Sequence, residues 1–327
     1  MLQTLPLVLF IIMTEVSIGS VSVLVFLDWR NEVKRGFLIS YGLIYLALTG
    51  LTYLFQQGFA YPGLLNTYQQ LDKAWTGYLT LPLLLFFLLL IPYNVFLWID
   101  RSAGVDSKVE QVKAEAQGQS RPYRRFSIVR LLRLLSGAAT VIVGLVMLFV
   151  MAMIFRPLAA VNLGGAITVA GFFAAAFALG GVLTAMWLGH WYLVTPALSE
   201  KPLQFATTLV LVAILAQVLF TITAGPTTVP VNQPSGGTSV TAPATPTSVP
   251  GTNVKPANAP VVTPISTGAI GWLHILVGFI IPLVLGALAW KLIRDRSFQS
   301  ATGMLYLVVV CTLAGEAMAR GLFLMGI

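Results

Sequence analysis

The sequence has little charge, one cysteine and two histidines, and each shortage excludes a class of protein. Only 9% of the 327 residues are charged, whereas 57% are hydrophobic, and the mean hydropathy is +0.87. Such a chain would not stay soluble, so a soluble catalytic domain is excluded. The single cysteine, Cys311, rules out an intrachain disulfide, a cysteine-ligated iron–sulfur cluster and a covalent C-x-x-C-H haem site.

Familiar catalytic motifs are also missing. The sequence has no metal-ligand spacing, Gly-rich phosphate loop, Ser-His-Asp arrangement or paired-carboxylate motif, so we expect no metal site. A net charge of +8 is compatible with nucleic-acid binding. The basic residues lie between the apolar runs, however, and membrane orientation explains them better, so we expect the bilayer and not nucleic acid as the partner.

Eight apolar runs are each long enough to cross a bilayer, which takes about 20 residues as a helix. The sequence therefore predicts an all-α, polytopic membrane protein, a bundle of about eight transmembrane helices. The predicted spans are 5–27, 36–56, 77–99, 133–155, 165–195, 203–224, 268–291 and 300–323.

The distribution of lysine and arginine predicts the orientation. Fifteen of the 19 basic residues follow the first, third, fifth and seventh spans. By the positive-inside rule these loops, including the basic loop at 100–133, are cytoplasmic, and both termini lie outside the cytoplasmic (inner) membrane. Within 100–133, the stretch VDSKVEQVKAEAQGQ predicts a short surface helix. The arginines that follow are expected at the membrane face, against anionic lipid or a docking partner: Arg121, Arg124, Arg125, Arg130 and Arg133.

The segment 225–267 separates helices one to six, in 1–224, from helices seven and eight, in 268–327. It contains nine of the 18 prolines and few large apolar residues, so we expect a disordered external loop. It could serve as a tether or a glycan-bearing stalk, or be a tolerated surface insertion.

Ionisable residues inside the spans are the candidate functional residues. An unpaired charge there costs at least roughly 2.5–3.5 kcal/mol, so each needs a partner, a water-filled cavity or a function. Glu316 and Arg320 lie four residues apart on one helix face and form either an ion pair or part of a polar cavity. Glu15 has no counter-charge on its own helix and lies roughly 15 Å deep at 1.5 Å per residue. It is the best candidate for a proton-carrying group.

His190 lies near the cytoplasmic end of the fifth span, beside Trp191 and Tyr192. It could ligate haem b, hydrogen-bond a quinone carbonyl or carry a proton. The alternative is an interfacial aromatic belt in which headgroups wet the imidazole. On the same helix, small residues recur every four positions and leave a smooth face for a neighbouring helix or a planar cofactor: Gly181, Ala185 and Gly189.

His274 lies near the outer end of the seventh span, beside Trp272. His190 and His274 are thus expected near opposite membrane faces, which argues against one haem bound by both. We therefore expect a quinone, menaquinone or ubiquinone, in preference to haem b. The predicted catalytic residues are Glu15, His274 and Glu316, and the predicted cofactor-binding residues are His190, Trp191, Tyr192 and Arg320.

Two ends of the chain, LPLVLFIIMTEVSIGSVSVLVFLDW at 5–29 and AGEAMARGLFLM at 314–325, resemble the first and last spans of the membrane anchor subunit of dimethyl sulfoxide reductase and its polysulfide-reductase-like relatives. The resemblance implies a helical bundle with external termini that exchanges electrons with menaquinol and holds iron–sulfur and molybdenum redox subunits. Members of that family have a quinol-linked histidine early in the chain. This chain departs from the pattern, because no histidine precedes His190.

Three functions remain open on the sequence. The first is an integral membrane subunit of a respiratory-type redox complex that binds quinol and anchors a redox partner, with Glu15, His274, Glu316 and Arg320 near one outer-half pocket. The second is a proton-coupled transporter or exporter that uses the same polar residues. The third is a structural accessory subunit whose polar residues only join helices.

Overall fold

The computed structural model describes residues 5–100, 103–105, 128–159, 164–195, 198–224 and 267–325. These ranges contain no β-strand, and eight of their helical stretches are long and apolar enough to cross a membrane. The all-α, eight-span prediction is therefore confirmed, and the chain is a multi-pass membrane protein. The predicted surface helix lies beyond Val105, outside the described residues. So do residues 225–266 of the predicted external loop.

The spans follow the apolar runs closely. Two short helices, α3 (Pro62–Leu65) and α4 (Lys73–Thr76), connect the second span to the third, and the 3-10 turn η1 (Arg156–Leu158) extends the fourth. The seventh span is α10 (Thr267–His274), the π-helix η2 (Ile275–Ile280) and α11 (Ile281–Arg294) in succession. The remaining spans are α1 (Leu5–Arg30), α2 (Arg35–Phe59), α5 (Thr80–Ile99), α7 (Ile128–Phe155), α8 (Gly164–Val194), α9 (Lys201–Ala224) and α12 (Phe298–Met325).

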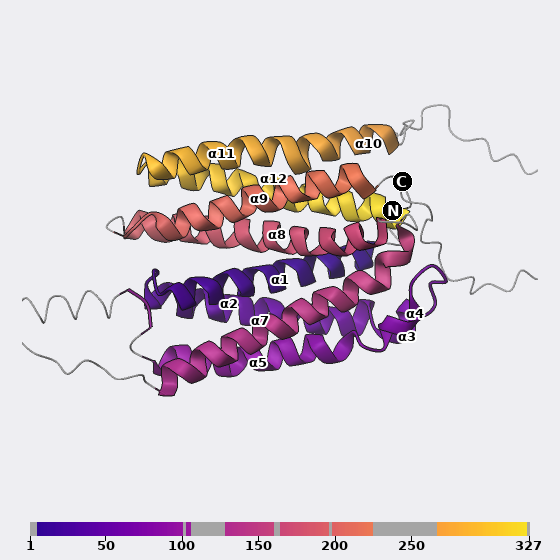
Figure 1. Ribbon diagram of the computed structural model, residues 1–327, viewed down its shortest axis with the longest axis horizontal. Helices are drawn as coiled ribbons and strands as arrows, with labels where there is room; N and C mark the ends of the chain where they lie inside the picture. Colours follow the sequence, from indigo (N-terminus) through magenta and orange to yellow (C-terminus); the bar gives the residue numbers. More distant parts are fainter. Residues whose placement is uncertain are drawn as a thin grey trace, which may run out of the picture.

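The helices run side by side along the long axis of the molecule, with α1 in the interior (Figure 1). In the most apolar window of α1, 89% of the residues are buried, against 28% in α9. Helix α1 packs against α2, α7, α8 and α12. Glycines allow the close approach of α1 and α8: a Cβ on Gly19 would overlap the carbonyl group of Ala176, and one on Gly180 would overlap the backbone of Gly19.

The bundle has two ends that differ in charge. At the end called here the terminal end, α1 begins and α12 finishes, and both chain termini are marked there in Figure 1. At the opposite end, called the basic end, α1 finishes at Arg30 and α9 begins at Lys201. Large apolar side chains such as Leu54 and Ile222 are exposed on the sides of the bundle and suit contact with lipid.

One helix boundary differs in a way that changes a prediction. Helix α7 begins at Ile128, five residues before the predicted start of the fourth span. Arg133 therefore lies inside the helix and is only 1% exposed. The expectation that Arg133 contacts anionic lipid at the membrane face is wrong, because the side chain turns into the bundle and meets two carboxylates there.

Candidate functional site

Four of the predicted residues lie in the half of the bundle nearer the terminal end, and three of them are in direct contact. The guanidinium of Arg320, on α12, pairs with Glu15 of α1, and its Nε lies 2.8 Å from Oε1 of Glu316. The amide of Gln217, on α9, donates a hydrogen bond of 2.9 Å to Oε2 of Glu316. We call these four residues, Glu15, Gln217, Glu316 and Arg320, the Glu15 cluster.

Helical spacing explains one ion pair of this cluster, and the packing of α1 against α12 explains the other. Glu316 and Arg320 meet because side chains four residues apart share a helix face. Glu15 reaches them because α1 packs directly against α12. The Arg320 guanidinium carbon also lies 4.0 Å from the centre of the Phe172 ring of α8, a cation–π contact in a site shielded from water.

The Glu15 cluster contains more acid than base. Two carboxylates face one guanidinium, and Glu15, Glu316 and Arg320 are all at most 8% exposed. Oε2 of Glu15 has no hydrogen-bond partner among the described residues. A buried charge without compensation is costly, so this arrangement favours either one additional proton on a carboxyl or a further positive group nearby.

His274 is the fourth predicted residue in this half of the bundle. It is 8% exposed, its ring stands edge-on to Phe279 with centroids 4.7 Å apart, and its helix α10 packs against α12, which carries Glu316 and Arg320. His274 directly precedes the π-helix η2, in which Gly278 contacts Gly315 of α12 backbone to backbone. π-helical turns inside α-helices often mark functional sites, and this one adjoins the Glu15 cluster.

The other predicted cofactor residues lie elsewhere. His190, Trp191 and Tyr192 are at the end of α8, at the basic end, while Arg320 is in the Glu15 cluster. His190 is exposed, Trp191 packs edge-on against Phe37, and the Tyr192 hydroxyl donates to the carbonyl of Ser199. The structure therefore separates the two histidines between the two ends, as the sequence predicted.

The smooth face of α8 packs against neighbouring helices. A Cβ on Gly181 would come within 3.0 Å of Val210 on α9, and one on Gly189 within 2.7 Å of Thr302 on α12. Ala185, between them, is fully buried. Of the two interpretations of these small residues, the structure supports close helix packing and leaves no room for a planar cofactor at Gly181 or Gly189.

A second buried cluster, which the sequence analysis missed, lies toward the basic end. Arg133 Nη1 is 2.9 Å from Oδ2 of Asp100, and Arg133 Nε is 3.3 Å from Oδ2 of Asp28. The Tyr93 hydroxyl donates to the same oxygen of Asp28 at 3.3 Å. We call Asp28, Tyr93, Asp100 and Arg133 the Asp28 cluster. The sequence contained a pattern that could have predicted this cluster. Two aspartates and an arginine lie close to the ends of three predicted spans, at the same depth in the membrane.

Hydroxyl groups extend along α1 between the two clusters. Ser17 and Thr52 of α2 are hydrogen-bonded at 3.0 Å, and the Tyr45 hydroxyl is 2.9 Å from the hydroxyl of Thr184. Ser20 is fully buried in the same stretch of α1. The polar residues of this helix thus face the interior of the bundle and not lipid.

The geometry of the site defines a membrane protein with two buried carboxylate–arginine clusters. Within the described ranges, no group of three or more His, Cys, Asp or Glu residues is placed to hold a metal ion. Comparison of the sequence with protein-family models and with curated proteins gives no match. The likeness to quinol-linked anchor subunits therefore stays a prediction from the two terminal spans.

Proposed function

We propose that this chain is the integral membrane subunit of a respiratory-type redox complex, binding quinol near the terminal end and anchoring a redox partner. One observation carries the proposal: Arg320 pairs with Glu316 on its own helix and with Glu15 from the opposite end of the sequence, and the helix of His274 packs against α12. These are the residues that the sequence predicted for one outer-half pocket.

The chemistry requires acceptors for protons. Oxidation of a quinol to the quinone releases two protons and two electrons. The unpaired Oε2 of Glu15 can accept one hydrogen bond from a hydroxyl, and the imidazole of His274 can accept another. The electrons would pass to an iron–sulfur or molybdenum subunit, since a single cysteine and two histidines give this chain few ligands for a centre of its own.

The proposed test measures proton binding and quinol binding on the purified full chain. Infrared difference spectra between acid and neutral pH should contain a protonated-carboxyl band that disappears in Glu15→Gln. Quenching of tryptophan fluorescence by a hydroxyquinoline N-oxide, a quinol analogue, should weaken by about tenfold in Glu15→Gln and His274→Ala, which removes roughly one charge-assisted hydrogen bond.

The matched control is Glu32→Gln, an isosteric change of a half-buried carboxyl at the basic end, paired with Arg30. It should leave both signals unchanged. Unaltered analogue binding in Glu15→Gln, His274→Ala and Glu316→Gln, each folded and tested singly, would refute the quinol site.

A proton-coupled transporter is the second candidate, and the Asp28 cluster favours it. Glu15 and Asp28 lie 13 positions apart on α1, so the two clusters are separated by about 20 Å at 1.5 Å per residue. Buried ionisable groups at two depths, with hydroxyls between them, are typical of a proton path. Proton flux into vesicles that contain the protein but no quinol, abolished by Glu15→Gln and by Asp28→Asn, would favour this function over the first.

The orientation completes the proposal. We propose that the basic end faces the cytoplasm and that both termini face outward in the inner membrane, because most lysines and arginines of the described residues lie at that end. A cysteine tag placed near residue 245 should react with an impermeant reagent in intact cells, whereas a tag near residue 113 should be protected. The reverse pattern would invert the orientation.

A further inference from the structure

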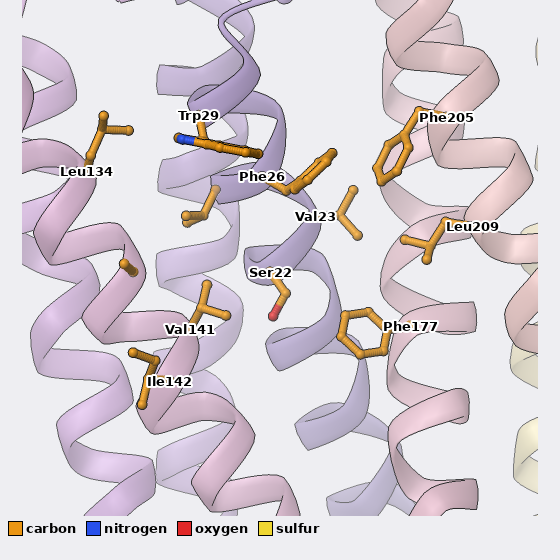
Figure 2. Close-up of a pocket in the computed structure, with 12 residues that line it drawn as sticks. Ser22, Val23, Phe26, Trp29, Leu134, Val141, Ile142, Phe177, Phe205 and Leu209 are labelled. Carbon is orange, nitrogen blue, oxygen red and sulfur yellow. The ribbon is translucent and has the colours of Figure 1, made fainter.

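An apolar groove of about 530 Å³ lies between α1, α7, α8 and α9, toward the basic end and away from the Glu15 cluster. Figure 2 shows Phe26, Trp29, Leu134 and Phe205 at one end of the groove, and Ile142 and Phe177 at the other. Its single hydroxyl, on Ser22, already donates to the carbonyl of Ile18 at 2.7 Å. The lining suits a hydrocarbon chain and offers little to the oxygens of a quinone head group.

Three cations lie one helical turn beyond this lining. Arg30 follows Phe26 by four residues on α1, Arg130 precedes Leu134 by four on α7, and Lys201 precedes Phe205 by four on α9. Residues four apart share a helix face, so each cation continues the face that lines the groove.

All three cations are exposed. The Arg30 guanidinium carbon lies 5.8 Å from the centre of the Phe26 ring, which is itself part of the lining. Arg30 also pairs with Glu32 at 2.9 Å, an exposed ion pair of the kind that contributes little and yields to a stronger anion. The mouth of the groove at the basic end is therefore positively charged.

We propose that this groove binds one acyl chain of an anionic phospholipid, with the lipid phosphate at Arg30, Arg130 and Lys201. The volume of about 530 Å³ falls within the roughly 300–1,000 Å³ of ligand pockets. Basic residues above an apolar cleft between spanning helices match a lipid in both parts, the phosphate and the chain. This lipid site is independent of the quinol proposal, since it shares no residue with the Glu15 cluster.

The test is native mass spectrometry of the full chain in detergent, with equal amounts of phosphatidylglycerol and phosphatidylcholine of the same acyl composition. The unmodified protein should retain one phosphatidylglycerol with a preference of about tenfold, because two or three cations gain from the anionic headgroup. Arg130→Gln combined with Lys201→Gln should bring the preference to near parity.

The matched control is Lys291→Gln combined with Arg294→Gln, which removes two exposed cations near the basic end, on α11, outside the groove. This control should keep the preference. Ala138→Phe, or the milder Ala138→Val, fills the groove from α7 and should reduce retention of both lipids several-fold while the cations remain.

Three results would overturn the proposal. The first is equal retention of the two lipids by the unmodified protein. The second is an equal loss of preference in the control and in the Arg130, Lys201 double variant. The third is full lipid occupancy in both folded Ala138 variants, which would place the bound lipid elsewhere on the bundle.

Discussion

The Glu15 cluster and the Asp28 cluster contain the same charges, two carboxylates and one guanidinium, and both use α1, yet they are built differently. In the Glu15 cluster, one carboxylate lies on the arginine's own helix, four residues away. In the Asp28 cluster, both carboxylates come from outside α7. The first arginine would keep a partner if the helices separated, whereas Arg133 would lose both.

From this difference we propose different roles for the two clusters. The Asp28 cluster fastens α7 to the end of α1 and to Asp100, directly after α5, and a tyrosine hydroxyl supports it. The Glu15 cluster joins α1, α9 and α12 and adjoins a π-helix. Each cluster leaves one oxygen of its α1 carboxylate, Oε2 of Glu15 or Oδ1 of Asp28, without a hydrogen-bond partner among the described residues. The first has the features of a structural clamp, and the second those of a site that can exchange a proton.

The largest expected effect comes from removing the arginine of the clamp. Arg133→Met removes the buried guanidinium that pairs with Asp28 and Asp100, which should cost about 3–5 kcal/mol of unfolding free energy. Reversible unfolding in mixed micelles of a mild detergent and SDS measures it. Arg320→Met should cost less, because a carboxyl that exchanges protons, as proposed for Glu15, can take up a proton when its counter-charge is removed, and Gln217 still donates to Glu316. An equal or larger loss in Arg320→Met would contradict the assignment of the two roles.

The second-largest effect is expected at the backbone contact between Gly278 and Gly315, which adjoins only the Glu15 cluster. Gly315→Val places side-chain atoms where α12 touches the backbone of Gly278, so the π-helix must move away from the Glu15 cluster. Overpacking of this kind costs about 1–3 kcal/mol. The infrared carboxyl band assigned to Glu15 should also shift, because the π-helix adjoins the Glu15 cluster. The control Gly303→Val, on the same helix but with open space around its Cβ, should leave both unchanged.

The tyrosine of the clamp should have a smaller effect. Tyr93→Phe removes the hydroxyl that donates to Asp28 at 3.3 Å, and loss of one such hydrogen bond costs about 0.5–1.5 kcal/mol of unfolding free energy. The infrared carboxyl band assigned to Glu15 should not move. A change in that band would mean that the two clusters are coupled along α1.

The smallest effect is expected for an ion pair outside the membrane. Arg296, between α11 and α12, has its Nη2 2.8 Å from Oε2 of Glu200, which directly precedes α9. A backbone hydrogen bond at Glu200, followed by the one from Arg296, holds the pKa of that carboxyl below its ordinary value. A lowered pKa means that the pair stabilises the fold at neutral pH and that this is lost as the pH falls through the carboxyl pKa.

Solvent screens this exposed pair, so Arg296→Gln should cost no more than about 0.5 kcal/mol at neutral pH. The cost should vanish in acid, where Glu200 is protonated. A cost comparable with that of Arg133→Met would show that burial is not what distinguishes the clusters from surface pairs. Reversible unfolding of Arg296→Gln in mixed micelles, measured at neutral and at acidic pH, tests both expectations.

The sequence by itself determined the bundle, because an apolar run of about 20 residues crosses a bilayer as a helix, in which every backbone group is hydrogen-bonded within the segment. The sequence also identified Glu15, His274, Glu316 and Arg320 as ionisable residues inside the spans, since a charge in an apolar run is visible without any structure. The pair Glu316–Arg320 was predictable as well, because helical spacing alone brings the two side chains together.

Only the tertiary structure decided which side chains meet across helices. That Glu15 reaches Arg320, 305 positions away, depends on α1 packing against α12. That Arg133 turns inward, away from lipid, depends on α7 starting at Ile128 and on two aspartates from elsewhere in the chain. The apolar groove and its three cations come from four helices. The apolar runs predict roughly where each helix begins and ends, but the neighbours of a helix depend on how closely small residues such as Gly19 and Gly180 let the backbones approach.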